Sequence, residues 1–225
     1  MLVSLPMNSV HLHGYWRSSG VYRVRIALLL KGIPYSYTAV NLLAGEQRAP
    51  AYLAVNPMGL VPALEVEGAL YTESVAVLEL LDELHPEPKL YPGDAGDRAR
   101  VRALVETINA GTQPLHNLRV VQAMAGTAEE KEAYTQGVIS GGLTAFQALV
   151  LRFEQLRGPE MSGPFCYGTA PTAADILLVP QLYAARRFKT DLRPFSRLLQ
   201  AEAAMKALPA VAAAAPELQP DFPGA

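Results

Sequence analysis

Two different hydrophobic patterns divide the chain. In roughly the first ninety residues, short runs rich in β-branched and aromatic side chains alternate with helical segments, in the order β-α-β, a connection, then β-β-α. One helix joins the first two strands, so these strands form a parallel βαβ unit within a mixed sheet. The predicted strands span 10–16, 35–40, 60–66 and 70–71, and the predicted helices span 21–31 and 73–84.

Turn residues separate these elements. Gly32 is placed to end the first helix in the left-handed conformation, and Glu67-Gly68 suits a tight turn between the last two strands. A polar and weakly helical stretch over 44–55 stops at Asn56-Pro57.

Beyond a segment rich in proline and glycine at 85–96, no strand pattern recurs. This segment is expected to be a linker, and the rest an all-helical domain with an irregular tail after Pro209. Thr172 and Asp175 fit a capping box at one helix start, and Pro180 is expected to kink that helix. The predicted helices span 97–110, 115–125, 129–157, 172–187 and 197–208.

Composition narrows the classes of function. Half of the 225 residues are hydrophobic and 18% are charged, with a net charge of −2, so nucleic acid and anionic membrane surfaces are not expected partners. The lone cysteine, Cys166, suits a reducing compartment, and with no apolar stretch of about 18 residues and no signal peptide the expected location is the cytoplasm. His11 and His13 alone make a poor metal site, so no metal is expected.

Candidate chemistry begins at Ser18-Ser19-Gly20, between the first strand and the first helix. The first amides of a helix have no intrahelical partner, and the helix dipole favours negative charge there. A serine hydroxyl at this point can donate to an anion such as a thiolate. The alternative is that one serine only caps the helix.

Two further features fit a small peptide ligand. Pro62 at a strand entrance is tolerated as a first residue or in a cis turn, and a cis bond would leave Val61 free to pair with an extended peptide. Glu73 and Ser74, at a helix start, can hold an ammonium and a carboxylate. The alternative for each feature alone is a hairpin proline or a capping serine.

The motifs resemble a known family. The run RSSGVYRVRIAL at 17–28, with Asn56-Pro57-Met58 and Val61-Pro62, resembles the zeta class of glutathione transferases, which includes maleylacetoacetate and maleylpyruvate isomerases. The likeness continues through QPLHNLRV at 113–120, LVPQ at 178–181, ARRFK at 185–189 and Asp191-Leu192. It therefore covers nearly the whole chain.

The resemblance implies an architecture and a cofactor. It implies an α/β thioredoxin-like N-terminal domain over 1–85, a linker over 86–96 and an all-α C-terminal domain over 97–225 that contributes the substrate pocket, in a homodimer. Glutathione is the implied cofactor. Its implied contacts are Ser18, Ser19, Gly20, Val21, Tyr22, Arg23, Gln47, Val61, Glu73, Ser74, Gln113, Asn117, Leu118 and Arg119.

The resemblance also implies a reaction. The bound thiolate, assisted by Ser18 and Ser19, adds to the cis double bond of a maleyl diketo acid, the bond rotates, and elimination restores the alkene as trans. The substrate is a small dicarboxylate, so fixed cations are needed. Arg17 and Arg187 are the first candidates and Arg119 is the third.

Other polar residues are given structural interpretations. Arg186 is expected on the surface or in an ion pair, and Arg25 in a structural ion pair. Tyr15 and His116 are expected to serve packing, and Cys166 is expected to behave as a small hydrophobe.

The chain departs from the family pattern at two points. Gly20 replaces the cysteine of the usual Ser-Ser-Cys, which weakens any mechanism that uses a protein thiol, and Gly168-Thr169 replaces the usual Gly-Asp. Two other functions stay open. One is a general glutathione transferase that conjugates or dehalogenates small electrophiles, and the other is a non-catalytic binding module.

Overall fold

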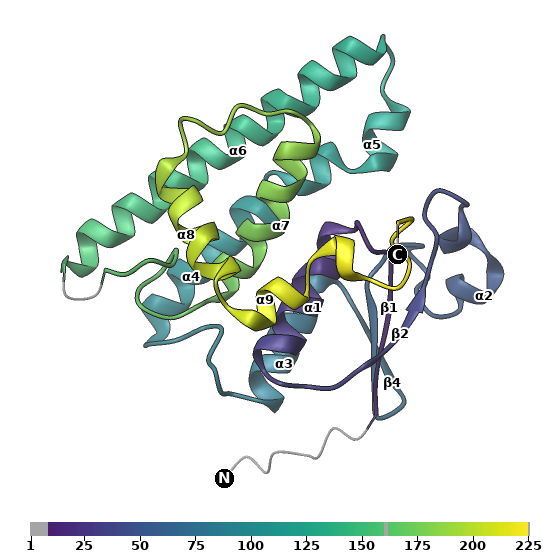
Figure 1. The fold of residues 1–225 in the computed structure, drawn as a ribbon, viewed down its shortest axis with the longest axis horizontal. Coiled ribbons are helices and arrows are strands. Elements are labelled where there is room, and N and C mark those ends of the chain that lie inside the picture. Colours follow the sequence, from purple (N-terminus) through teal and green to yellow (C-terminus); the bar gives the residue numbers. More distant parts are fainter. Residues whose placement is uncertain (1–8, 160–161, 225) are drawn as a thin grey trace. The chain divides into compact units, whose positions relative to one another are not determined.

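The computed structural model describes residues 9–159 and 162–224, which form two compact units. The first unit contains the described residues up to Leu90 together with those from Leu208 onward. The second unit runs from Tyr91 to Ala207. Figure 1 shows the ribbon of both units, with the strands confined to the first.

The first unit contains a four-stranded mixed sheet in the order β2-β1-β3-β4. β1 runs parallel to β2 and antiparallel to β3, which in turn runs antiparallel to β4. The predicted βαβ unit and hairpin are therefore confirmed. The strands are β1 (Val10–Gly14), β2 (Ser36–Ala39), β3 (Ala63–Val66) and β4 (Ala69–Thr72).

Helices cover this sheet, whose central strands β1 and β3 contain most of its buried side chains. Leu12 of β1 pairs in register with Leu64 of β3, and both are fully buried. In Figure 1, α1, α3 and α9 lie on one side of the sheet and α2 on the other. The helical segments are α1 (Ser19–Leu30), η1 (Glu46–Arg48), α2 (Pro50–Leu53), α3 (Ser74–Leu84), α9 (Pro209–Ala213) and η4 (Pro216–Leu218).

Local sequence signals set the turns of this unit. Gly32 follows α1 with φ of 64°, a conformation that a residue with a Cβ adopts only at a cost. Glu67 and Gly68 have φ of 49° and 81°, so both central residues of the hairpin are left-handed. This is the turn geometry whose twist matches that of the flanking strands.

The regular elements in the described part of the second unit are all helices, joined by loops. Its helical segments are α4 (Ala95–Asn109), η2 (Gln113–His116), α5 (Leu118–Ala123), α6 (Ala128–Arg157), α7 (Ala173–Arg187) and α8 (Ser196–Lys206). None of the helices described in the structure has the length and apolar character needed to cross a membrane.

The single helix predicted over 115–125 is wrong. Asn117 has an extended backbone (φ −61°, ψ 145°), and its side-chain oxygen accepts the Arg119 N–H at 3.2 Å. The segment therefore divides into the 3₁₀ turn η2 and the short helix α5. Hydrophobic periodicity cannot reveal this break, because Asn117 keeps the spacing while it caps a new helix.

The end of the chain also differs from the expectation. Residues from Leu208 onward group with the first unit instead of extending the helical domain, and they contain α9 and η4 instead of being irregular. α9 packs against α1, where the fully buried Arg25 donates to the carbonyl oxygen of Ala214 at 3.2 Å. A buried guanidinium requires acceptors, and this carbonyl supplies one.

Asp175 joins the start of α7 to the loop before it. α7 begins with the predicted capping box, and the Asp175 side chain is fully buried. One carboxylate oxygen accepts the Thr172 N–H and hydroxyl at 2.9 and 2.8 Å, and the other accepts the Cys166 N–H at 2.7 Å. Burial raises the pKa of the Asp175 carboxyl, while these donors act in the opposite direction.

Replacing Asp175 with alanine is expected to lower the free energy of unfolding by about 3 kcal/mol, because buried donors lose their acceptor. Urea denaturation measures this change. Glu129, in the first turn of α6 but exposed, is the matched control, and Glu129→Ala is expected to lower the same quantity by less than about 1 kcal/mol. Equal effects in the two variants would contradict the assignment of Asp175 as a buried anchor.

Candidate active site

The strand register brings three segments to one edge of the sheet. His13 of β1 pairs with Ala63 of β3, and Ala63 pairs with Thr72 of β4. The residues after β1, before β3 and after β4 therefore begin at the same edge. These are the three segments in which the sequence placed its candidate peptide-binding residues.

Ser18 is the N-cap of α1 and has an extended backbone conformation. Its Oγ accepts the Val21 N–H at 3.4 Å, and no acidic residue occupies the first turn of α1. The oxygen acts as acceptor in the cap, so the hydroxyl proton remains available to an anion. The two interpretations of Ser18, a helix cap and a donor to a thiolate, are compatible in one side chain.

The loop before β3 lies directly against this helix start. A Cβ built on Gly20 would stand 3.0 Å from Pro62 Cδ, 3.4 Å from the Val61 carbonyl oxygen and 3.9 Å from Ser18 Oγ. The Val61–Pro62 peptide bond is cis. Glycine at position 20 thus allows the Val61–Pro62 loop to approach α1 closely.

Val61 precedes the first residue of β3, so it lies outside the sheet ladder. Two side chains hold the residue before it. The Tyr52 hydroxyl and the Asn56 side-chain amide both donate to the Leu60 carbonyl oxygen at 2.7 Å. Asn56 belongs to a motif that the sequence singled out, whereas the role of Tyr52 carried no sequence signal, because it depends on how α2 folds back.

The third segment begins α3. Glu73 is the N-cap residue with φ of 65°, a conformation that only a few residues other than glycine adopt. No side chain caps this helix, and the Glu73 carboxylate is exposed. An unusual backbone conformation beside uncapped helix amides is typical of a ligand site.

Ser74 ties this segment to α1. Its side chain is 5% exposed, and its Oγ accepts a hydrogen bond from the Arg23 guanidinium at 3.0 Å. Arg23 is itself buried in the first unit. Arg23 therefore fixes the start of α3 relative to α1 from below the surface.

Three residues of the expected contact run are buried, and their contacts with glutathione stay a prediction. The side chains of Val21, Tyr22 and Arg23 are 0%, 3% and 2% exposed, so the structure does not support direct side-chain contacts from them to a ligand. They were expected in the site because they follow the serines in sequence. Helical geometry turns them toward the core instead, and leaves Ser18, Ser19 and Gly20 accessible.

Gln47 has an unsatisfied polar atom. Its side-chain oxygen is buried and has no hydrogen-bond partner among the described residues. Its backbone carbonyl oxygen would stand 3.0 Å from a Cβ built on Gly59, in the segment leading to Val61. A buried acceptor without a donor is unfavourable, and an N–H of a bound peptide would satisfy it.

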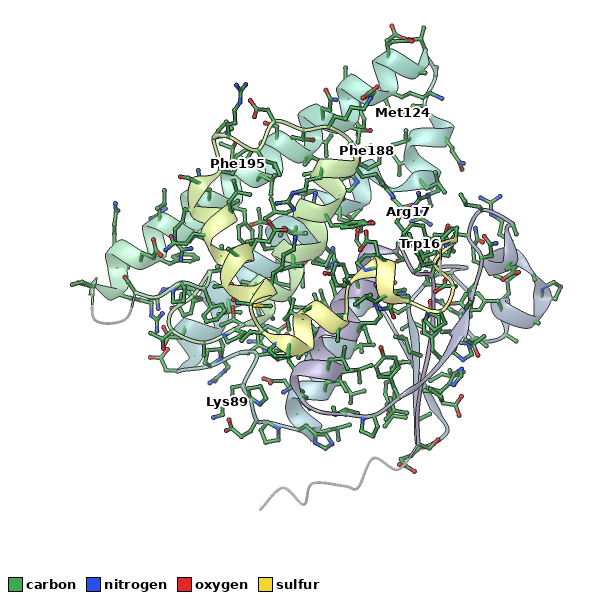
Figure 2. All side chains as sticks on the ribbon, viewed as in Figure 1. Trp16, Arg17, Lys89, Met124, Phe188 and Phe195 are labelled. Carbon is green, nitrogen blue, oxygen red and sulfur yellow. The ribbon has the colours of Figure 1, made fainter. Side chains whose placement is uncertain are left out.

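Arg17 directly precedes Ser18 and is partly accessible. Its guanidinium lies over the Trp16 ring, 5.2 Å from the ring centre, and no ion pair links it to a carboxylate among the described residues. Figure 2 labels both side chains. An arginine oriented by a ring and without a carboxylate partner of its own is suited to bind an anion.

The remaining expected site residues belong to the second unit. Leu118 is 48% exposed at the start of α5, and the Arg187 guanidinium lies over the Phe188 ring at 4.4 Å. The expectation that residues of this unit contact glutathione or substrate stays a prediction. These residues are Gln113, Asn117, Leu118, Arg119 and Arg187.

Several other polar residues make structural contacts. Arg186 forms an ion pair with the buried Glu202, as expected for a structural arginine. Arg25 instead donates to the backbone carbonyl oxygens of Ala214 and Trp16, so the ion pair expected for it is wrong. His116 is buried with its Nε2 3.3 Å from Gln181 Oε1, in a packing position.

The chain has no accessible sulfur nucleophile of its own. Cys166, its lone cysteine, is 1% exposed, and burial raises the pKa of its thiol well above the ordinary value. Position 20 carries glycine. Any thiolate chemistry at this site must therefore use a sulfur brought by a ligand.

Comparisons with known proteins show the family of the chain. Residues 12–89 match the family described as "Glutathione S-transferase, N-terminal domain". A protein of Drosophila melanogaster named "Probable maleylacetoacetate isomerase 2" is 41% identical over 214 residues, covering 94% of this chain and 90% of the relative.

Two solved structures are similar over nearly the whole chain. One is a holo maleylpyruvate isomerase described as a bacterial glutathione S-transferase of the zeta class, with TM-score 0.88, 38% identity, and coverage of 94% and 99% of the two chains. The other is a maleylacetoacetate isomerase from Anaeromyxobacter dehalogenans with dicarboxyethyl glutathione and citrate in its active site, with TM-score 0.84, 42% identity, and coverage of 98% and 97%.

The chain is thus an enzyme of glutathione transferase architecture. It belongs to the zeta-class glutathione transferases, the family of the maleylacetoacetate and maleylpyruvate isomerases.

Gly20→Val is expected to weaken glutathione binding by roughly tenfold or more, because the added methyl groups would force apart the helix start and the Val61–Pro62 loop. Isothermal titration calorimetry measures the affinity. Gly137, in α6 with no atom within 4 Å of an added Cβ, is the control, and Gly137→Ala is expected to raise the free energy of unfolding by about 0.5–1 kcal/mol. Wild-type affinity in Gly20→Val would show that the close approach is not needed.

Proposed function

We propose that this chain catalyses the glutathione-dependent cis–trans isomerisation of a maleyl diketo acid, maleylacetoacetate or maleylpyruvate. One observation carries the proposal. The accessible N-terminus of α1, with the Ser18 hydroxyl, lies against the Val61–Pro62 loop in a protein whose single cysteine is buried. The site is suited to hold and ionise the thiol of a ligand, because the single thiol of the protein is buried.

The residues of the first unit fit glutathione. The Val61 backbone, outside the ladder, can pair with the peptide backbone, and the uncapped start of α3 with Ser74 can bind the carboxylate of the γ-glutamyl group. The exposed Glu73 carboxylate can pair with its ammonium. The unpartnered oxygen of Gln47 can accept a peptide N–H.

When bound, glutathione supplies the nucleophilic thiolate that adds reversibly to the carbon–carbon double bond. The chain contributes electrostatics. The Ser18 hydroxyl donates to the sulfur, and the amides and dipole of α1 favour its negative charge, so a larger fraction is ionised at neutral pH.

The substrate needs a cation because it is a dicarboxylate and gains further negative charge as sulfur adds. Arg17 directly precedes Ser18 and has the planar fork that holds a carboxylate through two hydrogen bonds. Arg187, with Arg119 as a third candidate, is proposed to assist. Neither of these residues belongs to the first unit.

Glutathione consumption separates this function from general conjugation. Maleylacetone, a stable analogue, should be converted to the trans isomer while total free glutathione stays constant. A general transferase would instead consume one glutathione for each product, as with chlorodinitrobenzene. Turnover that always removes glutathione would reject the isomerase, and failure to bind immobilised glutathione would favour a non-catalytic module.

Ser18→Ala is expected to raise the pKa of the bound thiol and to slow turnover by about 100-fold, since one donor to the developing charge is lost. Thiolate absorbance against pH and steady-state kinetics measure these effects. Thr127→Ala, which removes the cap of α6, is the control for capping alone, and is expected to lower stability by about 1 kcal/mol with the thiol pKa unchanged. If only Ser19→Ala raised that pKa, the donor would be Ser19.

We further propose that the protein is a cytoplasmic homodimer. The family resemblance supports the dimer, and the lone buried cysteine supports a reducing compartment. Sedimentation should give twice the chain mass of 24.2 kDa.

A further inference from the structure

The end of the chain returns to the loop that presents Ser18. The Trp16 N–H donates to one carboxylate oxygen of Asp221 at 2.8 Å, and the Tyr37 hydroxyl donates to the other at 3.1 Å. The Phe222 ring packs edge-on against the Trp16 ring, with centres 5.0 Å apart. In Figure 1 the yellow C-terminal segment lies beside α1.

The same residue is also held on its carbonyl side. The Trp16 carbonyl oxygen accepts from the Arg25 guanidinium at 2.9 Å, and Arg25 also donates to the Ala214 carbonyl oxygen at 3.2 Å. Both backbone polar groups of Trp16 are therefore fixed, one by Asp221 directly and the other through Arg25 and α9.

Fixing Trp16 fixes Ser18. The Ser18 N–H donates to the Tyr15 carbonyl oxygen at 2.9 Å, so residues 15–18 form one hydrogen-bonded turn with Trp16 inside it. The Arg17 guanidinium lies over the Trp16 ring and shares this anchor. Without the anchor, the turn between β1 and α1 would gain freedom, and the Ser18 hydroxyl would lose its fixed direction.

We propose that Asp221 is a positioning residue for the glutathione thiolate site, acting through the Trp16 backbone. The inference rests on the proposed function, because it assigns Ser18 and Arg17 their roles toward thiolate and substrate. Asp221 lies 205 residues from Trp16 in sequence, and the hydrogen bond between them brings it to the turn that carries Ser18.

A purely structural role is the competing explanation. If Asp221 only linked the end of the chain to the turn before α1, loss of this link would lower the free energy of unfolding. The affinity for glutathione and the pKa of its thiol would then stay unchanged in the folded protein. A positioning role changes both. The test therefore measures the site separately from the free energy of unfolding.

The experiment compares Asp221→Ala, Asp221→Asn and Glu217→Ala. Asp221→Ala is expected to weaken glutathione affinity, raise the pKa of the bound thiol, and lower kcat/KM by roughly 10- to 100-fold. Asp221→Asn keeps an oxygen that accepts the Trp16 N–H. This variant is expected to keep most of the wild-type glutathione affinity, thiol pKa and kcat/KM. Glu217, exposed on the same segment, is the control and should match wild type.

Trp16 provides a readout that needs no glutathione. It is the only tryptophan, so its fluorescence reports on this turn alone. Asp221→Ala should shift the emission to longer wavelength, whereas Glu217→Ala should not. If the wild type failed to bind glutathione, the proposed function would fail, while the fluorescence would still report whether Asp221 holds the turn.

The outcomes are distinct. A folded Asp221→Ala protein with wild-type affinity and thiol pKa overturns the proposal, even if its stability is lower. If Asp221→Ala does not fold, Tyr37→Phe decides, because it removes one of the two donors to the carboxylate. A severalfold loss of affinity with a raised thiol pKa supports the proposal, and no change overturns it.

Discussion

The antiparallel register of β3 with β1 and β4 is the constraint on which the site depends. It sets the Ser18 turn, the Val61–Pro62 loop and the start of α3 at one edge of the sheet. Side chains alternate along a strand, so a shift of one residue would move buried Leu64 to the other face and displace the loop that follows. Core packing thus fixes the position of the binding residues.

Buried arginines connect this register to the ligand site. Arg23 and Arg25 lie within α1, yet each has a defined acceptor: Ser74 at the start of α3 for one, and the backbone of Trp16 and Ala214 for the other. A buried charge without partners is strongly unfavourable, so these acceptors stabilise the two buried guanidinium groups. These two side chains therefore link the core of the first unit to the edge where the candidate binding residues lie.

The division of chemistry between protein and ligand follows from the cysteine content. With glycine at position 20 and Cys166 buried, the protein supplies orientation and electrostatics, and the ligand supplies sulfur. An isomerisation regenerates the thiolate at the end of each turnover. The protein therefore has to stabilise the charge of the sulfur reversibly and needs no covalent bond to it. The helix N-terminus at Ser18, with one hydroxyl donor, is the group proposed to provide that stabilisation.

The sequence by itself determined the element order, the Gly32 and Glu67-Gly68 turns, the capping box at Thr172, and the candidate binding residues Ser18, Ser19 and Gly20 at the start of the first helix. These features depend on local conformational preferences and hydrophobic periodicity, which neighbouring residues encode. Tertiary structure alone decided the burial of Val21 to Arg23, the Tyr52 hydrogen bond and the return of the chain end to Trp16. Each depends on contacts between segments that no local pattern brings together, the longest of them spanning 205 residues.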